Sequence, residues 1–366
     1  MKQQIRLLFN TTTVSVAHLS AAKLDPAPPV STNGNSDSLL FADYITGWVE
    51  IVKPNITLNT YASYSNMAKA SIAPHFRERK TLLRDIAARD IQEFYTIKMS
   101  GGLKANTIIH FHAIIRKSLK YAMKMGMIHT NPADNVERPK KQPFIGSFYE
   151  VDELNRLLPL IADPHMKLAV SFGAFYGLRR SEIIGLKWDA INFEKKTITI
   201  CRTAQEFTLD GKIYRSVEEK TKNKASLRTL PLVSDFEQIL RRRKADQEEQ
   251  RALCGNCYDK NSIGFIMVNE MGELMKPGYV TQGFRHILRK HNLRHIRFHD
   301  LRHTCASLLI AEGVPIKEIQ EWLGHSTYAT TADIYAHLQY RSKISVANVM
   351  SSKGIKLQSD IAANPS

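Results

Sequence analysis

Apolar residues recur every three or four positions over much of the first third of the chain, and this spacing limits what that part can fold into. One turn of an α-helix takes about 3.6 residues, so side chains at this spacing share one face. The clearest stripe lies in the segment 39–52, and its members are Leu40, Phe41, Tyr44, Ile45, Trp48 and Val52. The pattern predicts an amphipathic helix that packs this stripe into a core.

Two shorter helices are expected next. One runs from about residue 57 to residue 72 and stops at Pro74, because proline has no backbone N–H with which to continue a helix. The other spans residues 91–99, with Asp90 as its N-cap and the pair Gly101-Gly102 after its end.

The longest helix is expected from about residue 105 to residue 125. Its apolar side carries Ile108, Phe111, Ile115, Leu119 and Ala122. Another side carries Arg116, Lys120 and Lys124, which could simply be a solvated face. However, the net charge of +16 favours a polyanionic partner, so these residues are predicted to contact DNA phosphates.

The remaining composition narrows the class of protein. A basic protein at a membrane surface is the competing interpretation, but the chain has no apolar run near the roughly twenty residues that a span requires. Residues 1–37 are polar and proline-rich, which predicts a flexible segment, and they contain no continuous apolar stretch typical of a secretory signal. A soluble, cytoplasmic protein is therefore expected.

Three prolines and a basic run in residues 132–147 predict an interdomain linker, in which Lys140 and Lys141 are expected to contact DNA. The linker separates a helical domain, 38–131, from a second domain, 148–342, and a tail, 343–366. Helices of the second domain are expected from Asp152, over 166–176, from Ser234 and over 277–290. Strands are expected at 197–202, 213–217, 227–230 and 265–268, and a loop at 254–262. The predicted fold class is mainly α with a small antiparallel β-sheet (α+β).

The four cysteines indicate a reducing compartment rather than a disulfide framework. Cys254 and Cys257 have the spacing of a zinc-ligand pair, but a second pair at zinc-finger spacing is missing. They are interpreted as incidental thiols of a loop, with a metal or redox role as the alternative.

Four short motifs carry the residues of a candidate site. They read Gly177-Leu178-Arg179-Arg180-Ser181-Glu182, His299-Asp300-Leu301-Arg302-His303, Leu323-Gly324-His325 and Ile334-Tyr335-Ala336-His337. Each is weak alone, since such residues often form surface ion pairs or pack in a core. Together they supply two arginines, two histidines and a tyrosine, and arginine binds phosphate oxygens bidentately. The set suits attack on a phosphodiester.

In order and type, these motifs resemble those of tyrosine recombinases of the phage and conjugative-element integrase family, over roughly residues 39–345. The resemblance implies a helical core-binding domain followed by a catalytic domain. Many integrases carry an extra DNA-binding domain ahead of these two, and residues 1–37 look too short and too polar for one.

The resemblance also implies a role for each matching residue. Tyr335 would be the nucleophile, and His299 would accept its proton. Arg179 and Arg302 would stabilise charge on the phosphate, with a hydrogen bond from His325. Glu182 would orient the first arginine. The family's lysine lies in the turn before a strand ending in Arg-x-x-Pro-Leu, so Lys222 is the best match, with Lys220 and Lys224 as alternatives.

The expected activity is site-specific recombination of DNA through a 3′-phosphotyrosyl intermediate, which integrates or excises a mobile element. No cofactor or catalytic metal is predicted, because the sequence offers no carboxylate cluster for one. The expected partners are double-stranded DNA attachment sites and three further copies in a synaptic tetramer, with a monomer when free. The family allows for a directionality factor as well, and the tail 343–366 is expected to contact a neighbouring subunit or to pack on its own domain.

Three alternatives share parts of this pattern. A chromosome-dimer resolvase of the Xer type is the nearest, and a type IB topoisomerase would relax DNA without exchanging partners. A DNA-binding protein with a relic site is the third. The lysine-rich turn and the basic linker favour a mobile-element integrase.

Overall fold

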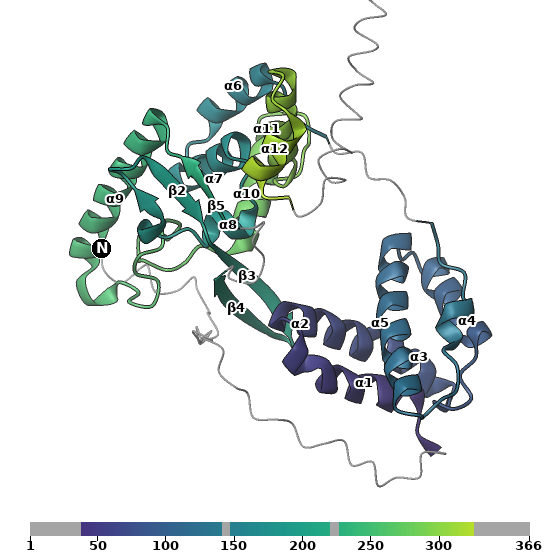
Figure 1. Cartoon of the computed structure of the whole chain (residues 1–366). Helices are drawn as coiled ribbons and strands as arrows, with labels where there is room; N and C mark the ends of the chain where they lie inside the picture. The colour runs from purple at the N-terminus through teal and green to yellow at the C-terminus, as the bar shows by residue number, and fades with distance from the viewer. Residues whose placement is uncertain (1–37, 141–146, 220–226, 326–366) are drawn as a thin grey trace, which may run out of the picture. The chain divides into compact units, whose positions relative to one another are not determined.

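The computed structural model describes residues 38–140, 147–219 and 227–325 (Figure 1). They divide into two compact units. The helical unit takes its described residues from 1–145 and 205–216, and the mixed unit takes them from 146–204 and 217–366. The expected N-terminal segment 1–37 and the tail 343–366 lie outside the described residues, as do Lys141, Lys222 and Tyr335.

Five α-helices build the core of the helical unit. They are α1 (Phe41–Val52), α2 (Leu58–Met67), α3 (Ala73–Glu78), α4 (Ala88–Ser100) and α5 (Ala105–Lys124). The predicted stripe of α1 is buried at Phe41, Ile45 and Trp48, and the whole predicted apolar side of α5 is buried. The hydroxyl of Tyr44 donates to the carbonyl of Ser118 at 2.6 Å and joins α1 to α5. Both helices are confirmed, and their apolar sides form one core.

A helical run crosses Pro74, so the prediction that a helix stops there is wrong. α2 continues into a π-helix, η3 (Ala68–Ile72), and then into α3. In the wider π turn the N–H of Ala73 bonds to the carbonyl of Ala68. Pro74 then falls in the first turn of α3, where a missing N–H leaves no intrahelical bond unmade.

The helix predicted for residues 91–99 begins earlier than expected. α4 starts at Ala88, and Asp90 lies inside its first turn rather than at the N-cap. From there the Asp90 carboxylate accepts the backbone N–H of Ala87 at 2.9 Å. Asp90 therefore caps the start of the helix, as predicted, but it does so from the third helical position.

The mixed unit is helical with small sheets, which confirms the predicted fold class. Its helices are α6 (Val151–Leu160), α7 (Pro164–Phe175), α8 (Arg180–Ile184), α9 (Ser234–Cys254), α10 (Pro277–Lys290), α11 (Asp300–Ala311) and α12 (Ile316–Leu323). α7 is central and apolar, and a Cβ at its Gly173 would lie 3.2 Å from the side chain of Leu301 on α11. Across the described ranges, no helix has the length and apolar character that a membrane span needs.

The strands of the described residues form two sheets. β1 (Ile191–Asn192), β2 (Thr197–Ile200) and β5 (Arg228–Pro231) make an antiparallel sheet in the order β1-β2-β5, in which Ile200 pairs with Arg228. β3 (Arg202–Leu209) and β4 (Lys212–Glu219) make a two-stranded sheet. The prediction missed most of β3, because it placed only residues 197–202 in a strand.

Two further predictions are wrong, and one boundary is shifted. α9, with 21 residues, is longer than α5, with 20, which was expected to be the longest helix. α9 also includes Cys254, the first residue of the expected loop 254–262, and a short 3-10 helix, η7 (Gly255–Cys257), follows it. Residues 265–268 make isolated bridges in place of a strand. Side chains of α9 hold this segment: Arg243 donates to the carbonyl of Val268 at 2.6 Å, and Gln247 donates to that of Ile266 at 2.8 Å. These bonds take up carbonyls that a neighbouring strand would otherwise use.

Candidate active site

The first arginine motif forms the turn between α7 and α8. Gly177 has a left-handed φ of +62°, and a Cβ there would lie 2.2 Å from Cδ2 of Leu323 on α12. Arg179 precedes α8, and Glu182 lies in the first turn of that helix. The Glu182 carboxylate accepts the backbone N–H of Arg179 at 3.1 Å and its Nη1 at 2.8 Å. The short spacing of the motif thus fixes the guanidinium at the start of the helix.

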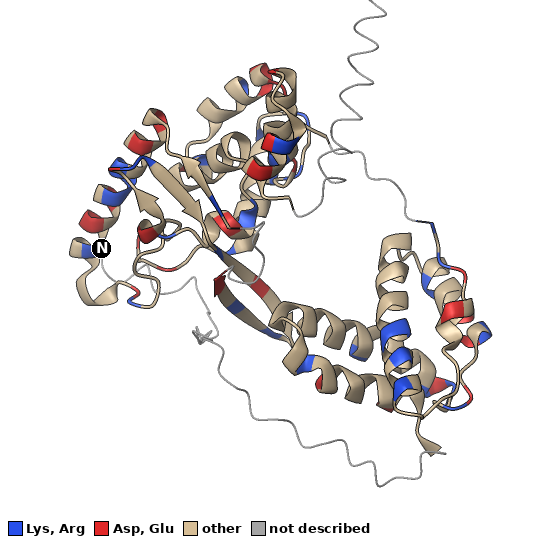
Figure 2. Ribbon diagram, viewed as in Figure 1, with Lys and Arg blue, Asp and Glu red and all other residues tan. Residues whose placement is uncertain are grey.

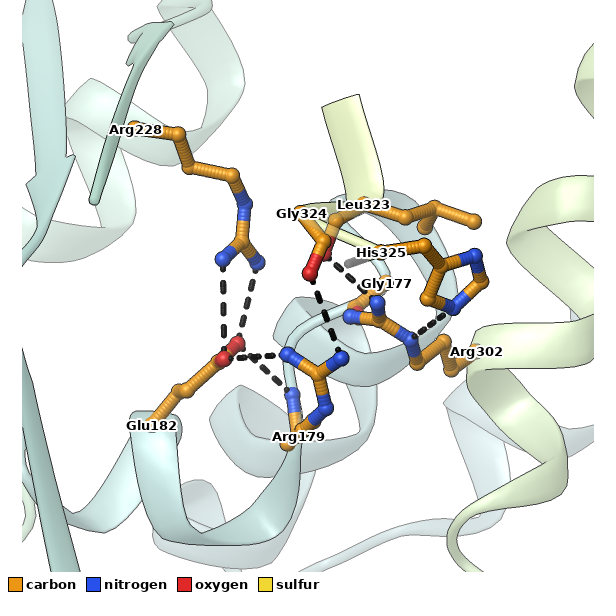
Figure 3. A network of polar contacts seen from close by, with 8 residues as sticks. All are labelled: Gly177, Arg179, Glu182, Arg228, Arg302, Leu323, Gly324 and His325. Atoms are coloured by element: carbon orange, nitrogen blue, oxygen red, sulfur yellow. Dashed lines mark hydrogen bonds and ion pairs between the residues drawn. The ribbon is translucent and has the colours of Figure 1, made fainter. Parts of the chain in front are cut away.

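Arg302 is buried at the centre of the site, with 1% of its surface exposed. Its Nη1 donates to the carbonyl of Gly177 at 2.7 Å and its Nη2 to that of Leu323 at 2.6 Å. Its Nε donates to Nε2 of His325 at 3.1 Å (Figure 3). One side chain from α11 therefore joins the first arginine motif to the end of α12.

The end of α12 is a source of acceptors for both arginines. The last carbonyls of a helix have no intrahelical partner and carry the negative end of the helix dipole. Leu323 supplies one such carbonyl to Arg302, and Gly324, left-handed at φ 67° and ψ 49°, supplies another to Nη2 of Arg179 at 3.3 Å. The two guanidinium groups are thereby held without a carboxylate between them.

The hydrogen bond from Arg302 determines the tautomer of His325. The Nε of arginine always carries a proton, so Nε2 of His325 must be the unprotonated acceptor. Burial, followed by the charges of Arg302 and Arg179, lowers the pKa of His325 to about 3. At neutral pH the ring is neutral with its proton on Nδ1. A hydrogen bond that His325 donates to a phosphate must therefore come from Nδ1.

Burial, followed by the charge of Arg179, lowers the pKa of Arg302 to about 9. The group is still protonated at neutral pH. A cation with this much lost hydration gains strongly from any anion that enters the site.

His299 lies at the start of α11, one turn before Arg302. Its ring meets that of His303 edge to face, with centroids 5.3 Å apart. Lost hydration, followed by electrostatic coupling to His303 and by the charges of Arg302 and Arg297, lowers the pKa of His299 to about 4. The residue keeps an exposed surface, so its neutral ring can accept a proton from a substrate or nucleophile.

Asp300 anchors this end of α11. It is 2% exposed and accepts Nη2 of Arg297 at 2.7 Å and the backbone N–H of Arg297 at 2.8 Å. The carboxylate thus neutralises a charge just outside the site and fixes the turn that carries His299.

Arg228 on β5 is a member of the site that the sequence prediction left out. Its Nη2 donates to Oε2 of Glu182 at 2.9 Å, and its Nη1 lies 3.5 Å from Oε1 (Figure 3). The only sequence signal was the Arg-x-x-Pro-Leu pattern, which served to place Lys222 rather than to identify Arg228.

These hydrogen bonds bring together four of the predicted site residues, Arg179, Glu182, Arg302 and His325. His299 lies three residues before Arg302, at the start of α11. Lys222 and Tyr335 fall outside the described residues. Within residues 38–140, 147–219 and 227–325, no three His, Cys, Asp or Glu side chains are grouped to hold a metal ion.

The predicted DNA-binding residues lie in the helical unit. Arg116 and Lys120 line a cavity of about 500 Å³, together with Lys117, Arg138 and Asp134. Lys124 and Lys140 are exposed but do not line it, and Lys141 is outside the described residues.

The described residues thus form a helical unit and a mixed unit that holds a cluster of arginines around Glu182 and His325. The mixed unit matches the model of the phage integrase family over residues 148–342, and residues 40–99 match the phage integrase N-terminal SAM-like domain. The chain belongs to the phage integrase family and is a tyrosine recombinase, an enzyme that cleaves and rejoins DNA.

Two curated relatives cover most of the chain. The tyrosine recombinase XerC-like protein of Caldanaerobacter subterraneus subsp. tengcongensis is 27% identical over 72% of this chain and 71% of its own length. The ICEBs1 integrase of Bacillus subtilis is 25% identical over 83% and 80%. Among solved structures, the Tn1549 transposon integrase in complex with a circular intermediate DNA has the same fold, with a TM-score of 0.68, 18% identity and coverage of 85% and 100%.

Proposed function

We propose that this recombinase integrates and excises a mobile DNA element by cutting and rejoining specific attachment sites through a 3′-phosphotyrosyl intermediate. The observation that carries this proposal is the arrangement of Arg179, Arg302 and His325, which places two guanidinium groups and a neutral imidazole around one point. The similarity to the ICEBs1 integrase over 83% of the chain supports the mobile-element assignment.

In the cleavage step, the phenol oxygen of Tyr335 forms a bond to the scissile phosphorus while the bond to the 5′-oxygen of the next nucleotide breaks. His299 takes the phenol proton, and Lys222 gives a proton to the departing oxygen. The products are a 3′-phosphotyrosyl link and a strand with a free 5′-hydroxyl. The reverse reaction with another strand's 5′-hydroxyl restores the DNA and releases the tyrosine, so no ATP is needed.

Arg179 and Arg302 stabilise the charge that builds on the non-bridging oxygens. The hydrogen bonds described above hold both groups before DNA arrives, so little reorganisation is required during the reaction. His325 adds a hydrogen bond from Nδ1. Fixed guanidinium groups thus supply the charge stabilisation that metal ions supply in other phosphoryl-transfer enzymes.

The helical unit binds DNA through the C-terminal half of α5, where Arg116, Lys117, Lys120 and Lys124 follow a first half with no Lys or Arg (Figure 2). Lys140 and Lys141 extend this contact. Arg116 is paired with Asp134 at 2.5 Å, so it must leave a carboxylate to reach a phosphate, whereas Lys120 lines the same cavity at an exposed position. These cations provide affinity through release of counterions.

Exchange between two duplexes breaks four strands, and each break consumes one tyrosine. The reaction therefore calls for four copies of the chain on two attachment sites, which assemble from monomers when DNA is bound.

The tail 343–366 joins the copies, and a directionality factor selects excision over integration. Removing residues 343–366 should leave binding to a single site unchanged and abolish synapsis; full recombination by the truncated protein would contradict this role. The reaction takes place in the cytoplasm.

The test of the nucleophile uses a nicked duplex that the full chain selects from a random-sequence library by binding. Wild-type protein should form a covalent adduct with this suicide substrate, and Tyr335→Phe should bind it equally well without forming the adduct. An adduct of undiminished yield in Tyr335→Phe would refute the assignment, and Tyr328, Tyr340 and His337 would be examined next.

The general acid is tested with the same duplex. Lys222→Ala should slow cleavage by about 10²–10⁴-fold, the usual contribution of a positioned proton donor. A 5′-bridging phosphorothiolate should restore most of the rate, because sulfur leaves without a proton. Rescue confined to Lys220→Ala or Lys224→Ala would move the role to that residue.

A second candidate is resolution of chromosome dimers, because the XerC-like relative is 27% identical over 72% of the chain. A resolvase acts on one chromosomal site, whereas an integrase acts on a pair of sites that differ outside a shared core. Mapping covalent adducts over the host genome distinguishes the two.

A further inference from the structure

We propose that Arg228 is a positioning residue for DNA cleavage: it binds the Glu182 carboxylate and through it sets the position and charge of Arg179. The proposal rests on the proposed function of this site. It concerns a residue of β5 whose guanidinium group approaches the Glu182 carboxylate from a different direction than that of Arg179 (Figure 3).

Within the described part of the site, guanidinium groups of Arg179 and Arg228 both contact Glu182, whose side chain is buried. Its side chain is 0% exposed, and that of Arg228 is 6% exposed. Arg228 Nη2 contacts Oε2 at 2.9 Å, while Arg179 Nη1 contacts Oε1 at 2.8 Å. The shorter side-chain contact of each arginine goes to a different oxygen of the carboxylate, while the backbone N–H of Arg179 shares Oε2 with Arg228. A shift of Glu182 toward one guanidinium group would weaken its bond to the other.

This sharing has an electrostatic consequence for Arg179. A carboxylate that is paired with Arg179 alone would neutralise the charge that should bind the phosphate. With Arg228 added, Arg179, Arg228 and Arg302 together carry three positive charges against the single negative charge of Glu182. The described part of the site thus has a formal excess of two, which matches the two negative charges of a five-coordinate phosphorane.

Arg228 also links the start of β5 to α8. Residues 220–226, which include Lys222, join β4 to β5, and Arg228 is the first residue of β5. Its backbone pairs with Ile200 in the sheet, while its side chain binds Glu182 in the first turn of α8. The ion pair therefore ties the first residue of β5 to the helix that Arg179 precedes.

The competing explanation is that the ion pair only stabilises the fold, since removing one partner of a buried pair leaves an uncompensated charge. Arg243 is a matched control for this possibility. With main chain and side chain counted together, Arg228 and Arg243 are each 8% exposed. Arg243 bonds the main-chain carbonyls of Ile266 and Val268, which lie outside the described site.

The experiment compares two forms of the selected suicide duplex, one with a scissile phosphodiester and one with a neutral methylphosphonate. If Arg228 acts on the charge of the phosphate through Arg179, Arg228→Met should slow cleavage of the phosphodiester by about 10–100-fold and that of the methylphosphonate by less than about 3-fold. DNA affinity should be unchanged. Arg228→Lys should restore part of the rate, and Arg243→Met should affect both substrates equally.

A second measurement keeps the proposal testable if Arg228→Met folds poorly. Glu182→Gln removes the buried charge, and because Arg228 acts through Glu182, adding Arg228→Met to Glu182→Gln should cause no further loss. Equal losses on both substrates, or additive losses in the double variant, would overturn the role of Arg228. Absence of any adduct with the wild-type protein would instead count against the proposed function.

Discussion

The helical and mixed units use their basic residues in opposite ways. In the mixed unit, Arg302 and Arg228 are buried and are held by carbonyls and a carboxylate before any DNA is present. In the helical unit, Arg116, Lys117 and Lys120 are exposed around an open cavity. A buried guanidinium group is held in one orientation, and its attraction to a phosphate is stronger because the surroundings have a low dielectric constant. An exposed side chain is attracted more weakly but can adjust to many positions of the DNA backbone. The same charge therefore serves chemistry in one unit and affinity in the other.

The largest effect should follow from removing the central buried cation. Arg302→Ala should reduce single-turnover cleavage by about 10³–10⁵-fold, the range for an arginine that stabilises a phosphoryl-transfer transition state. Arg302→Lys should recover little, because one ammonium cannot reach the carbonyls of Gly177 and Leu323 and a phosphate together. Arg116→Ala, the control from the other unit, should cleave at the wild-type rate once DNA is saturating. Loss of the same size in both variants would remove the distinction between the units.

A smaller effect is expected from pH, and its sign follows from the lowered pKa values of His325, about 3, and His299, about 4, against the ordinary 6.5. Below pH 6.5 the unfolded chain takes up protons that the folded protein does not, so stability is full above pH 6.5 and falls toward pH 4. His299 stays neutral down to about pH 5, so cleavage should not decline near pH 6.5. Denaturant unfolding and cleavage rates at pH 7, 6, 5 and 4 test both statements. An acid limb centred at pH 6.5 that His299→Gln abolishes would contradict them.

The smallest effects should come from the exposed cations. Lys120→Ala should weaken DNA binding by about 5-fold and lower the slope of log affinity against log salt by about 1. Asp134→Asn should strengthen binding by about 2-fold at low salt, because it frees Arg116 from its ion pair. Arg89→Ala, an exposed single-charge change outside the cavity, is the control. A cleavage defect in Lys120→Ala at saturating DNA would assign this residue to the chemistry.

Sequence reasoning succeeded where the signal was local. The period of apolar residues in α5 predicted its bounds to within one residue, and α10 was predicted at its observed bounds. The π turn before Pro74 was not predicted, because a shift of one backbone hydrogen bond does not change the spacing of apolar residues in a recognisable way. The motifs predicted that Arg179, Glu182, Arg302 and His325 share one site, and hydrogen bonds bring these four residues together.

The contacts that hold those residues were not predictable in the same way. Arg302 bonds carbonyls of Gly177 and Leu323, and a carbonyl is common to every residue, so sequence does not show which ones an arginine will meet. Arg228 is 46 residues from Glu182, and only the tertiary fold brings the two side chains together. Residue types therefore indicated the chemistry, while tertiary packing supplied its geometry.

The close approach at Gly177 has a consequence for the ancestry of this chain. A Cβ at residue 177 would lie 2.2 Å from Leu323, and the left-handed backbone adds its own cost. A larger residue at position 177 would require a smaller side chain at position 323, and both positions must keep the carbonyls that Arg302 binds. Substitutions at these two positions, which are 146 residues apart in the sequence, should therefore occur together among related proteins.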